Sequence, residues 1–214
     1  MPKFKLYHYW RSSTSWRVRW AFAIKNISCE FVAINLLSDE NLSPEHLKRN
    51  PMGYVPVLEF TEEPKRYLAE SLAIIEWLEE TFPNPKLLPG DTFQRAKIRQ
   101  LAETVNANIH PVQNLTVREY YSPDPEKQKI WAQYWITNGL KAYETLVQET
   151  AGKFSVGNTL TLADLCLIPQ CYNALRNAVP LELFPTVHRI YLEAMSTESC
   201  LSACPDQHAP PRLK

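Results

Sequence analysis

Four consecutive hydroxyl residues at positions 12–15 (Ser-Ser-Thr-Ser) are the group in this chain best suited to chemistry. They follow an apolar run at 4–9 that predicts a strand, and they precede a run at 18–24 that predicts a buried helix. At such a junction backbone N–H groups lack partners and the helix dipole is positive, so an anion such as a thiolate is stabilised. The same residues could also form an ordinary helix N-cap.

The segments that must position these hydroxyls predict a small α/β unit. We expect, in chain order, a strand at 4–9, a helix at 18–24, strands at 29–34, 57–60 and 66–68, and a helix at 72–78. A strand, a helix and a strand in succession predict a right-handed crossover with parallel pairing, and the later strands predict a hairpin. Ser43-Pro44 should open a short helix, and Pro56 stands where a strand tolerates proline, at its start.

The second half of the chain carries helical signals only. Residues 82–91 hold three prolines and one glycine, which indicates a linker. We therefore expect a small α/β domain at 1–82, a linker at 83–91 and an all-helical domain at 92–214. Helical periodicity covers 92–121 and 125–150, a capping box at 161–164 opens another helix, and Pro185 opens one that reaches 195. The tail from Pro205 should be poorly ordered.

Composition excludes several classes of partner. The 214 residues contain 23 Lys plus Arg and 23 Asp plus Glu, so no basic field favours nucleic acid. No apolar run approaches the roughly 18 residues of a membrane span, and the first strand follows so directly that no signal peptide is expected. The five cysteines form no Cys-x-x-Cys pair and the five histidines lack ligand spacing. We expect a cytoplasmic protein without a metal site.

Four local motifs, in the correct order, resemble the zeta class of the glutathione transferases. The segment 12–19 (Ser-Ser-Thr-Ser-Trp-Arg-Val-Arg) is similar to the signature of that class, and 50–56 is similar to its cis-proline loop. Residues 70–74 resemble the site for the γ-glutamyl end of glutathione, and 111–115 with 162–170 resemble helical-domain segments. The resemblance covers nearly the whole chain. It implies a thioredoxin-like domain with a four-stranded mixed sheet, an all-α domain, glutathione as cofactor and a homodimer.

The resemblance and the chemistry together assign the thiolate site. Ser12 is the first choice as hydrogen-bond donor to the glutathione thiolate, and Thr14 is the second. The zeta pattern has Cys where this chain has Thr14, and Thr at this position resembles the maleylpyruvate isomerases of the same class. Arg11 stands beside this site.

Five residues are expected to bind the rest of glutathione. Ser71 would bind the γ-glutamyl carboxylate at a helix start, and Glu70 would pair with the ammonium. Val55 would offer its backbone to the cysteinyl unit if Pro56 is cis, which the sequence does not decide. Asn41 and Gln113, the latter on the first long helix of the second domain, are further candidates.

The implied reaction is cis–trans isomerisation of an unsaturated dicarbonyl acid, maleylacetoacetate to fumarylacetoacetate, by reversible thiolate addition. Such a substrate needs cations for its carboxylates, and Arg11 and Arg176 are the candidates. His110 is expected in the cleft by resemblance. Three alternatives stay open: a maleylpyruvate isomerase, a general detoxifying glutathione transferase, and a transferase-like module that only binds partners.

Overall fold

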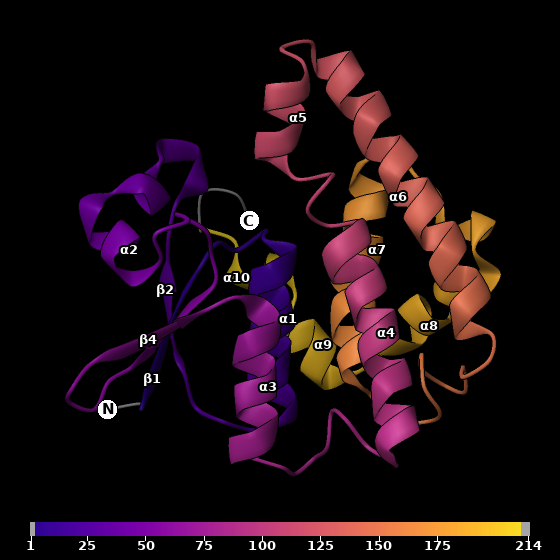
Figure 1. Cartoon of the computed structure of the whole chain (residues 1–214), viewed down its shortest axis with the longest axis horizontal. Helices are drawn as coiled ribbons and strands as arrows, with labels where there is room; N and C mark the ends of the chain where they lie inside the picture. The colour runs from indigo at the N-terminus through magenta and orange to yellow at the C-terminus, as the bar shows by residue number, and fades with distance from the viewer. Residues whose placement is uncertain (1–2, 211–214) are drawn as a thin grey trace. The chain divides into compact units, whose positions relative to one another are not determined.

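A four-stranded mixed sheet organises the first part of the computed structural model, which describes residues 3–210 (Figure 1). Its strands are β1 (Phe4–His8), β2 (Glu30–Ala33), β3 (Val57–Phe60) and β4 (Arg66–Ala69). They lie in the order β2-β1-β3-β4, with β1 and β2 parallel and the other pairs antiparallel. The predicted βαβ-ββα arrangement is therefore confirmed, because the crossover makes the first pair parallel and the hairpin makes the last pair antiparallel.

Helices cover both faces of this sheet. They are α1 (Ser13–Ile24), the short 3-10 turns η1 (Leu36–Ser38) and η2 (Glu40–Leu42), α2 (Pro44–Arg49) and α3 (Ser71–Thr81). Figure 1 shows α1 and α3 together on one side and α2 on the other. Because strand side chains alternate, Phe4 contacts Phe22 of α1 and Trp77 of α3, whereas Tyr7 faces the opposite way. The Tyr7 ring lies 4.0 Å from the guanidinium of Arg49 of α2.

The last described helices, α9 (Glu198–Ala203) and α10 (Pro205–His208), group with the sheet rather than with the second helical unit. Trp20 Nε1 donates to Ser199 Oγ at 3.0 Å, and Arg19 Nε donates to the carbonyl of Ala203 at 3.0 Å. The expectation that the chain loses order from Pro205 is wrong for residues 205–208. The sequence assigned 198–210 to the helical domain because no local pattern records contacts to α1. Residues 211–214 lie outside the described part.

The second unit, residues 87–197, is helical. Its elements are α4 (Thr92–Asn108), α5 (Leu115–Tyr121), α6 (Pro125–Val147), α7 (Leu162–Arg176), η3 (Leu181–Leu183) and α8 (Pro185–Met195). The helical periodicity over 92–121 spans two helices, because a turn at 109–114 separates α4 from α5. Pro111 lacks the N–H that a helix interior needs, and Asn114 caps the start of α5 by accepting from the Leu115 N–H.

The capping box that opens α7 is confirmed. The buried carboxylate of Asp164 accepts from the N–H and the hydroxyl of Thr161, at 2.8 and 2.9 Å, and from the N–H of Ser155 at 2.8 Å. Burial raises the pKa of Asp164, against the opposing effect of these hydrogen bonds. The box ties α7 to the preceding loop, because Ser155 belongs to that loop and also accepts from the hydroxyl of Tyr143 in α6.

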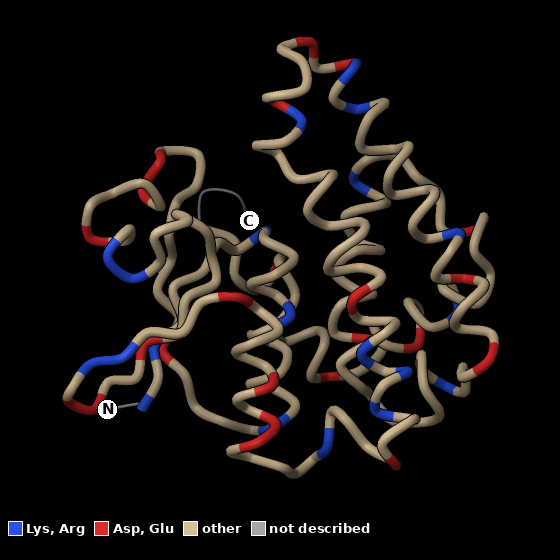
Figure 2. Tube along the Cα trace, viewed as in Figure 1, with Lys and Arg blue, Asp and Glu red and all other residues tan. Residues whose placement is uncertain are grey.

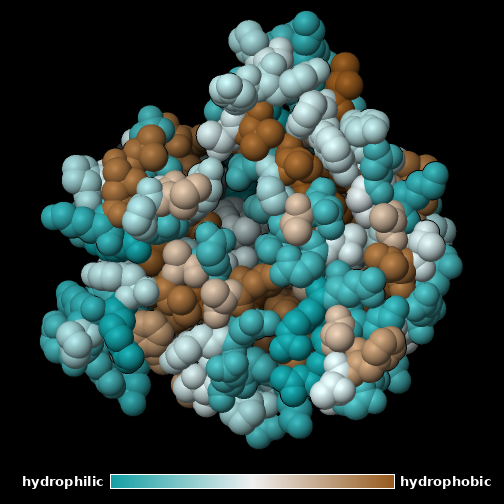
Figure 3. All heavy atoms as spheres, in the orientation of Figure 1, coloured by the Kyte–Doolittle hydropathy of each residue, from teal (hydrophilic) through white to brown (hydrophobic). Residues whose placement is uncertain are grey.

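The charged and apolar residues of the surface do not single out one site. Basic and acidic positions are interspersed along the trace (Figure 2). Apolar side chains gather around η1, η2 and α2, where Leu37, Leu42 and Met52 are exposed (Figure 3). Within residues 3–210 no helix is both long and apolar enough to cross a membrane. The same residues contain no group of three or more His, Cys, Asp or Glu that could hold a metal ion.

A buried histidine links stability of the first unit to pH. His8 is 4% exposed, and its Nδ1 lies 3.1 Å from Nη1 of Arg19. Because a guanidinium only donates, Nδ1 must accept and His8 must be neutral. Burial lowers the pKa of His8 from 6.5 to about 3, and the charge of Arg19 lowers it further in the same direction.

Acidification should therefore destabilise the protein through His8. Between about pH 6.5 and 3 the unfolded chain binds a proton at this residue that the folded chain excludes, so stability falls as pH falls. We expect about 2 kcal/mol of loss from His8 by about pH 5. Denaturant unfolding of the wild type and of His8→Asn, whose amide oxygen also accepts, measures this. Equal losses on acidification in the two proteins would contradict the assignment.

Candidate functional site

Ser12 occupies the N-cap of α1. Its Oγ accepts from the N–H of Ser15 at 3.1 Å, and its own N–H donates to the carbonyl of Tyr9 at 3.1 Å. The helix starts at Ser13, earlier than the apolar run at 18–24 predicts, because the cap rather than the apolar stretch sets its first turn. The cap interpretation and the anion-site interpretation are thus compatible, since the half-buried hydroxyl stands at a positive helix end.

The two candidate thiolate donors are hydrogen-bonded to one another. Oγ1 of Thr14 donates to the carbonyl of Val55 at 3.0 Å, and it lies 2.9 Å from Oγ of Ser12. A hydroxyl has one hydrogen and a carbonyl oxygen can only accept, so the hydrogen of Thr14 is committed to Val55. The hydrogen of Ser12 must then point to Thr14. Of the two, only Ser12 has a hydrogen that can turn to a ligand without breaking the bond to Val55.

Val55 precedes Pro56 through a cis peptide bond, the geometry that the sequence left undecided. Both residues are buried at the start of β3. The Val55 carbonyl retains a second lone pair beside the bond from Thr14. The backbone of Val55 is therefore fixed in position next to the start of α1.

Three side chains hold the loop that leads to Val55. Nε2 of His46 and Nδ2 of Asn50 each lie 3.1 Å from the carbonyl of Tyr54. Nδ2 of Asn41 donates to the carbonyl of Gly53 at 2.7 Å, so this candidate ligand residue is also a loop-holding residue. Oδ1 of Asn41 is buried and has no hydrogen-bond partner among the described residues. It is the part of Asn41 that remains available to a ligand donor.

Glu70 and Ser71 form the start of α3. Glu70 has φ 69° and ψ 119°, a backbone conformation uncommon for a residue with a side chain, and its exposed carboxylate makes no capping bond to the helix. Ser71 is buried, and its Oγ accepts from Nη1 of Arg17 at 3.2 Å. The first unit thus has a serine hydroxyl at the start of α1 and another at the start of α3. Helix α1 links the two, because Ser12 caps it and its Arg17 donates to Ser71.

Arg11 lies in the turn between β1 and α1. It is half-buried, and its guanidinium stands 5.1 Å from the ring centroid of Trp10. The sequence prediction that it neighbours the hydroxyl cluster is consistent with this turn. Its role toward a substrate stays a prediction.

Three predicted residues belong to the second unit, which is described separately. Gln113 and His110 lie in the turn between α4 and α5, so the prediction that Gln113 lies on the first long helix is wrong. Gln113 is buried, donates to Oε1 of Gln170 at 3.1 Å and accepts from Nδ2 of Asn173 at 2.6 Å. Arg176 is the exposed last residue of α7. The structure therefore places Gln113 in a polar network with α7.

Packing from α6 fixes the turn that holds Gln113. Nε1 of Trp131 donates to the carbonyl of Val112 at 2.6 Å. Gly139 faces the same turn, and a Cβ added there would lie 2.2 Å from Cγ1 of Ile109. A side chain at position 139 would therefore have to displace the side chain of Ile109.

Sequence reasoning missed two supporting residues. Arg17 and Gln170 entered the sequence analysis only as parts of the resembling segments 12–19 and 162–170. The signal for Gln170 is its spacing, since Gln170, Asn173 and Asn177 repeat at helical intervals on α7. The signal for Arg17 is an arginine inside an otherwise apolar helix.

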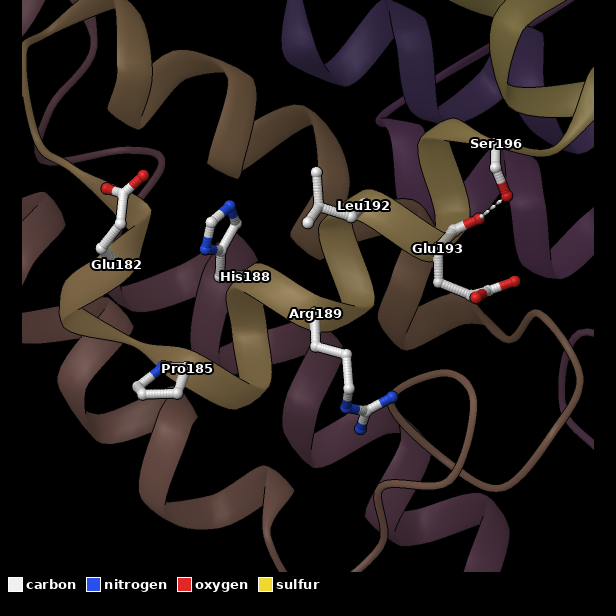
Figure 4. Close-up of a pocket in the computed structure, with 7 residues that line it drawn as sticks. All are labelled: Glu182, Pro185, His188, Arg189, Leu192, Glu193 and Ser196. Atoms are coloured by element: carbon white, nitrogen blue, oxygen red, sulfur yellow. Dashed lines mark hydrogen bonds between the residues drawn. The ribbon is translucent and has the colours of Figure 1, made fainter.

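Two hollows on the surface of the described residues are lined by other side chains. One of about 540 Å³ runs along α8 in the second unit, where Oγ of Ser196 donates to the carbonyl of Glu193 (Figure 4). It is lined by Glu182, Pro185, His188, Arg189, Leu192, Glu193 and Ser196. Another of about 280 Å³ lies between α1, β2 and α9 in the first unit. Neither is lined by a residue predicted for the site, so chemistry rather than hollow size identifies the candidate residues.

Comparison with known proteins gives these residues a family. Residues 6–86 match the model of the glutathione S-transferase N-terminal domain, and 110–199 match that of the C-terminal domain. The chain is 42% identical over 205 residues to maleylacetoacetate isomerase of Dictyostelium discoideum, covering 94% of this chain and 92% of that protein.

Solved structures agree with this match. A maleylacetoacetate isomerase from Anaeromyxobacter dehalogenans, with glutathione in its active site, has a TM-score of 0.89 and 43% identity and covers 98% of this chain and 97% of its own. A bacterial zeta-class maleylpyruvate isomerase has a TM-score of 0.89 and 36% identity, with 97% and 98% covered. The chain belongs to the glutathione S-transferase family, in the zeta class that includes the maleylacetoacetate isomerases.

Proposed function

We propose that this chain is a glutathione-dependent cis–trans isomerase that converts maleylacetoacetate to fumarylacetoacetate and has glutathione transferase activity. The observation that carries the proposal is the hydroxyl of Ser12 at the start of α1, whose hydrogen can turn from Thr14 to a ligand. The similarity to maleylacetoacetate isomerases over nearly the whole chain supports the choice of substrate class.

The residues of the first unit fit the chemical groups of glutathione. Ser71 at the start of α3 suits a carboxylate, the exposed carboxylate of Glu70 suits an ammonium, and Val55 suits a peptide backbone. Ser12 suits a thiolate. Glutathione, when bound, supplies a thiolate that adds reversibly to a conjugated double bond and so permits rotation about it.

Ser12 has to supply only a modest preference for the ionised thiol. A free thiol has a pKa of about 8.5, and lowering it to about 7 takes about 2 kcal/mol of preferential thiolate stabilisation. A hydroxyl hydrogen bond to an anion together with the dipole of α1 is of this size. Ser12 is therefore the proposed catalytic donor, and Thr14 is proposed to accept the hydrogen of Ser12 when no ligand is present.

The substrate places a separate demand on the protein. Its carboxylates and the negative charge that develops on its carbonyl oxygen need positive groups, which Arg11 and Arg176 are proposed to provide. Asn41 in the first unit and Gln113 and His110 in the second remain proposed ligand contacts. Oδ1 of Asn41 and the second amide hydrogen of Gln113 are the atoms available for this.

A maleylpyruvate isomerase is the second candidate. The observation in its favour is Thr14, which replaces the Cys of the zeta signature, together with the similarity to a zeta-class maleylpyruvate isomerase. An assay of both maleyl acids with and without glutathione decides between them. Conjugation of neutral electrophiles with no isomerisation would instead support a detoxifying transferase, and glutathione binding without turnover would support a binding module.

A homodimer in the cytoplasm is also proposed. Membership of the family supports the dimer, and light scattering of the purified protein tests it. The cytoplasm is supported by five free cysteines, four of them buried, because a reducing compartment keeps thiols unpaired.

Removing the Ser12 hydroxyl should weaken thiolate stabilisation. We expect Ser12→Ala to lower the ultraviolet absorbance of bound glutathione thiolate at neutral pH about fivefold, because the hydrogen-bond share of the roughly 2 kcal/mol is lost while the dipole of α1 remains. Thr14→Val is the matched control. It should keep most of this absorbance and weaken glutathione binding severalfold, because the Val55 carbonyl loses its donor. The reverse order of effects would make Thr14 the thiolate donor.

Removing the Arg176 guanidinium should separate the two activities. We expect Arg176→Ala to lower kcat/KM for the maleyl acid about 100-fold, the cost of losing a charged hydrogen-bond pair, and Arg176→Lys to recover part of it. Conjugation of a neutral electrophile should change less than threefold. Equal losses in both assays would assign Arg176 to the scaffold.

A further inference from the structure

A buried hydrogen bond in the first unit joins Arg17 to Ser71. Arg17 of α1 is 0% exposed, and its Nη1 donates to Oγ of Ser71, the first residue of α3, at 3.2 Å. Ser71 is itself 4% exposed. A buried guanidinium is costly unless its position serves packing, hydrogen bonding or an anion. Its partner here is the residue proposed to bind the γ-glutamyl carboxylate.

The bond from Arg17 determines the direction of the Ser71 hydroxyl. A guanidinium has five N–H groups and no acceptor, so Oγ of Ser71 must be the acceptor in this pair. A serine hydroxyl carries one hydrogen, which is therefore directed to a different atom. On the side that faces Arg17 the Ser71 oxygen can only accept, so the hydroxyl hydrogen is excluded from that side and remains for another acceptor.

The start of α3 leaves room for an acceptor from outside the protein. The first backbone N–H groups of a helix have no partner within the helix, and the side chain of Glu70 makes no capping bond to them. The first turn contains no acidic residue either. A carboxylate at this point would accept hydrogen bonds from the first N–H groups of α3 and from the hydroxyl of Ser71. The positive charge of Arg17, which is bonded to the same hydroxyl oxygen, would lie close to it.

Arg19, two residues further along α1, shows that burial of an arginine in this helix does not by itself indicate a ligand. It is equally buried, but it donates to the backbone carbonyls of Trp10 and Ala203 and to Nδ1 of His8. Those partners join the ends of β1 and α9. Arg19 thus serves the scaffold, and Arg17 addresses a predicted ligand residue.

We propose that Arg17 is a positioning residue for glutathione, which turns the hydroxyl of Ser71 toward the γ-glutamyl α-carboxylate and places a positive charge behind it. The inference deepens the proposed function and rests on the assignment of Ser71 to that carboxylate. It predicts that the contribution of Arg17 depends on the ligand carboxylate and not on the thiol.

Calorimetric titration of two ligands tests this. One is glutathione, and the other is an analogue in which hydrogen replaces the γ-glutamyl α-carboxylate. For Arg17→Met we expect the Kd of glutathione to rise at least tenfold while the Kd of the analogue changes less than twofold. Arg17→Lys, which keeps a charge and a donor, should keep most of the preference for glutathione, and Arg17→Gln, which keeps a donor alone, should lose most of it.

Arg19→Met serves as the matched control for burial. It should lower the unfolding midpoint and leave the ratio of the two Kd values unchanged. If Arg17→Met does not fold, the Lys and Gln variants still compare charge with hydrogen bonding. Equal weakening of both ligands, or an unchanged Kd for glutathione, would overturn the role of Arg17. A wild-type protein that binds both ligands equally would overturn the assignment of Ser71 instead, and isomerase activity tests the reaction separately.

Discussion

The hydrogen bond from Thr14 to the carbonyl of Val55 is the constraint on which the candidate site depends. It joins the first turn of α1 to the cis-proline loop, 41 residues away in the chain. Because it uses the only hydrogen of Thr14, it also determines that Ser12 donates to Thr14 rather than the reverse. One bond thus fixes the distance between two backbone segments and the direction of a neighbouring hydroxyl.

Arg17 and Arg19 of α1 also connect backbone segments through hydrogen bonds. This helix is buried around most of its surface, so its two arginines cannot extend into solvent. Arg17 reaches the start of α3, and Arg19 reaches the ends of β1 and α9. Their hydrogen bonds hold the loops around α1 in place, and this gives a helix with little amphipathic character a specific orientation on the sheet.

Local chemistry explains which parts of the fold the sequence could predict. The cap at Ser43, the capping box of Thr161 and Asp164, and the prolines at 44 and 185 act within one turn. The helix starts that they predict are confirmed. The parallel pairing of β1 with β2 and the hairpin of β3 and β4 followed from the succession of elements. Contacts between residues far apart in the chain have no local sequence signal. One example is the packing of α9 on α1, where Trp20 donates to Ser199 across more than 170 residues. The break at 109–114 was missed because its apolar spacing continues through the turn.

The same distinction between local signals and long-range contacts applies to the candidate site. The presence of hydroxyls at a helix start is a local property, and the sequence displayed it. Which hydroxyl is free to donate depends on Val55, which only the fold brings near. The backbone of Glu70 has φ 69°, and a glutamate in the sequence gives no indication of such a conformation. Residue type thus indicates what a group can do, and the fold decides which of several similar groups does it.

The replacement of Cys by Thr at position 14 gains a physical meaning from this arrangement. A thiol is a weak hydrogen-bond donor, whereas the hydroxyl of Thr14 makes a 3.0 Å bond to Val55. The residue is then part of the framework that holds Ser12 and the cis-proline loop together. Thr14 then favours a maleylpyruvate isomerase by resemblance alone, because its hydroxyl is already bonded to the backbone. Arg11 and Arg176, the cations proposed for the substrate carboxylates, are the groups that we expect to choose between the two maleyl acids.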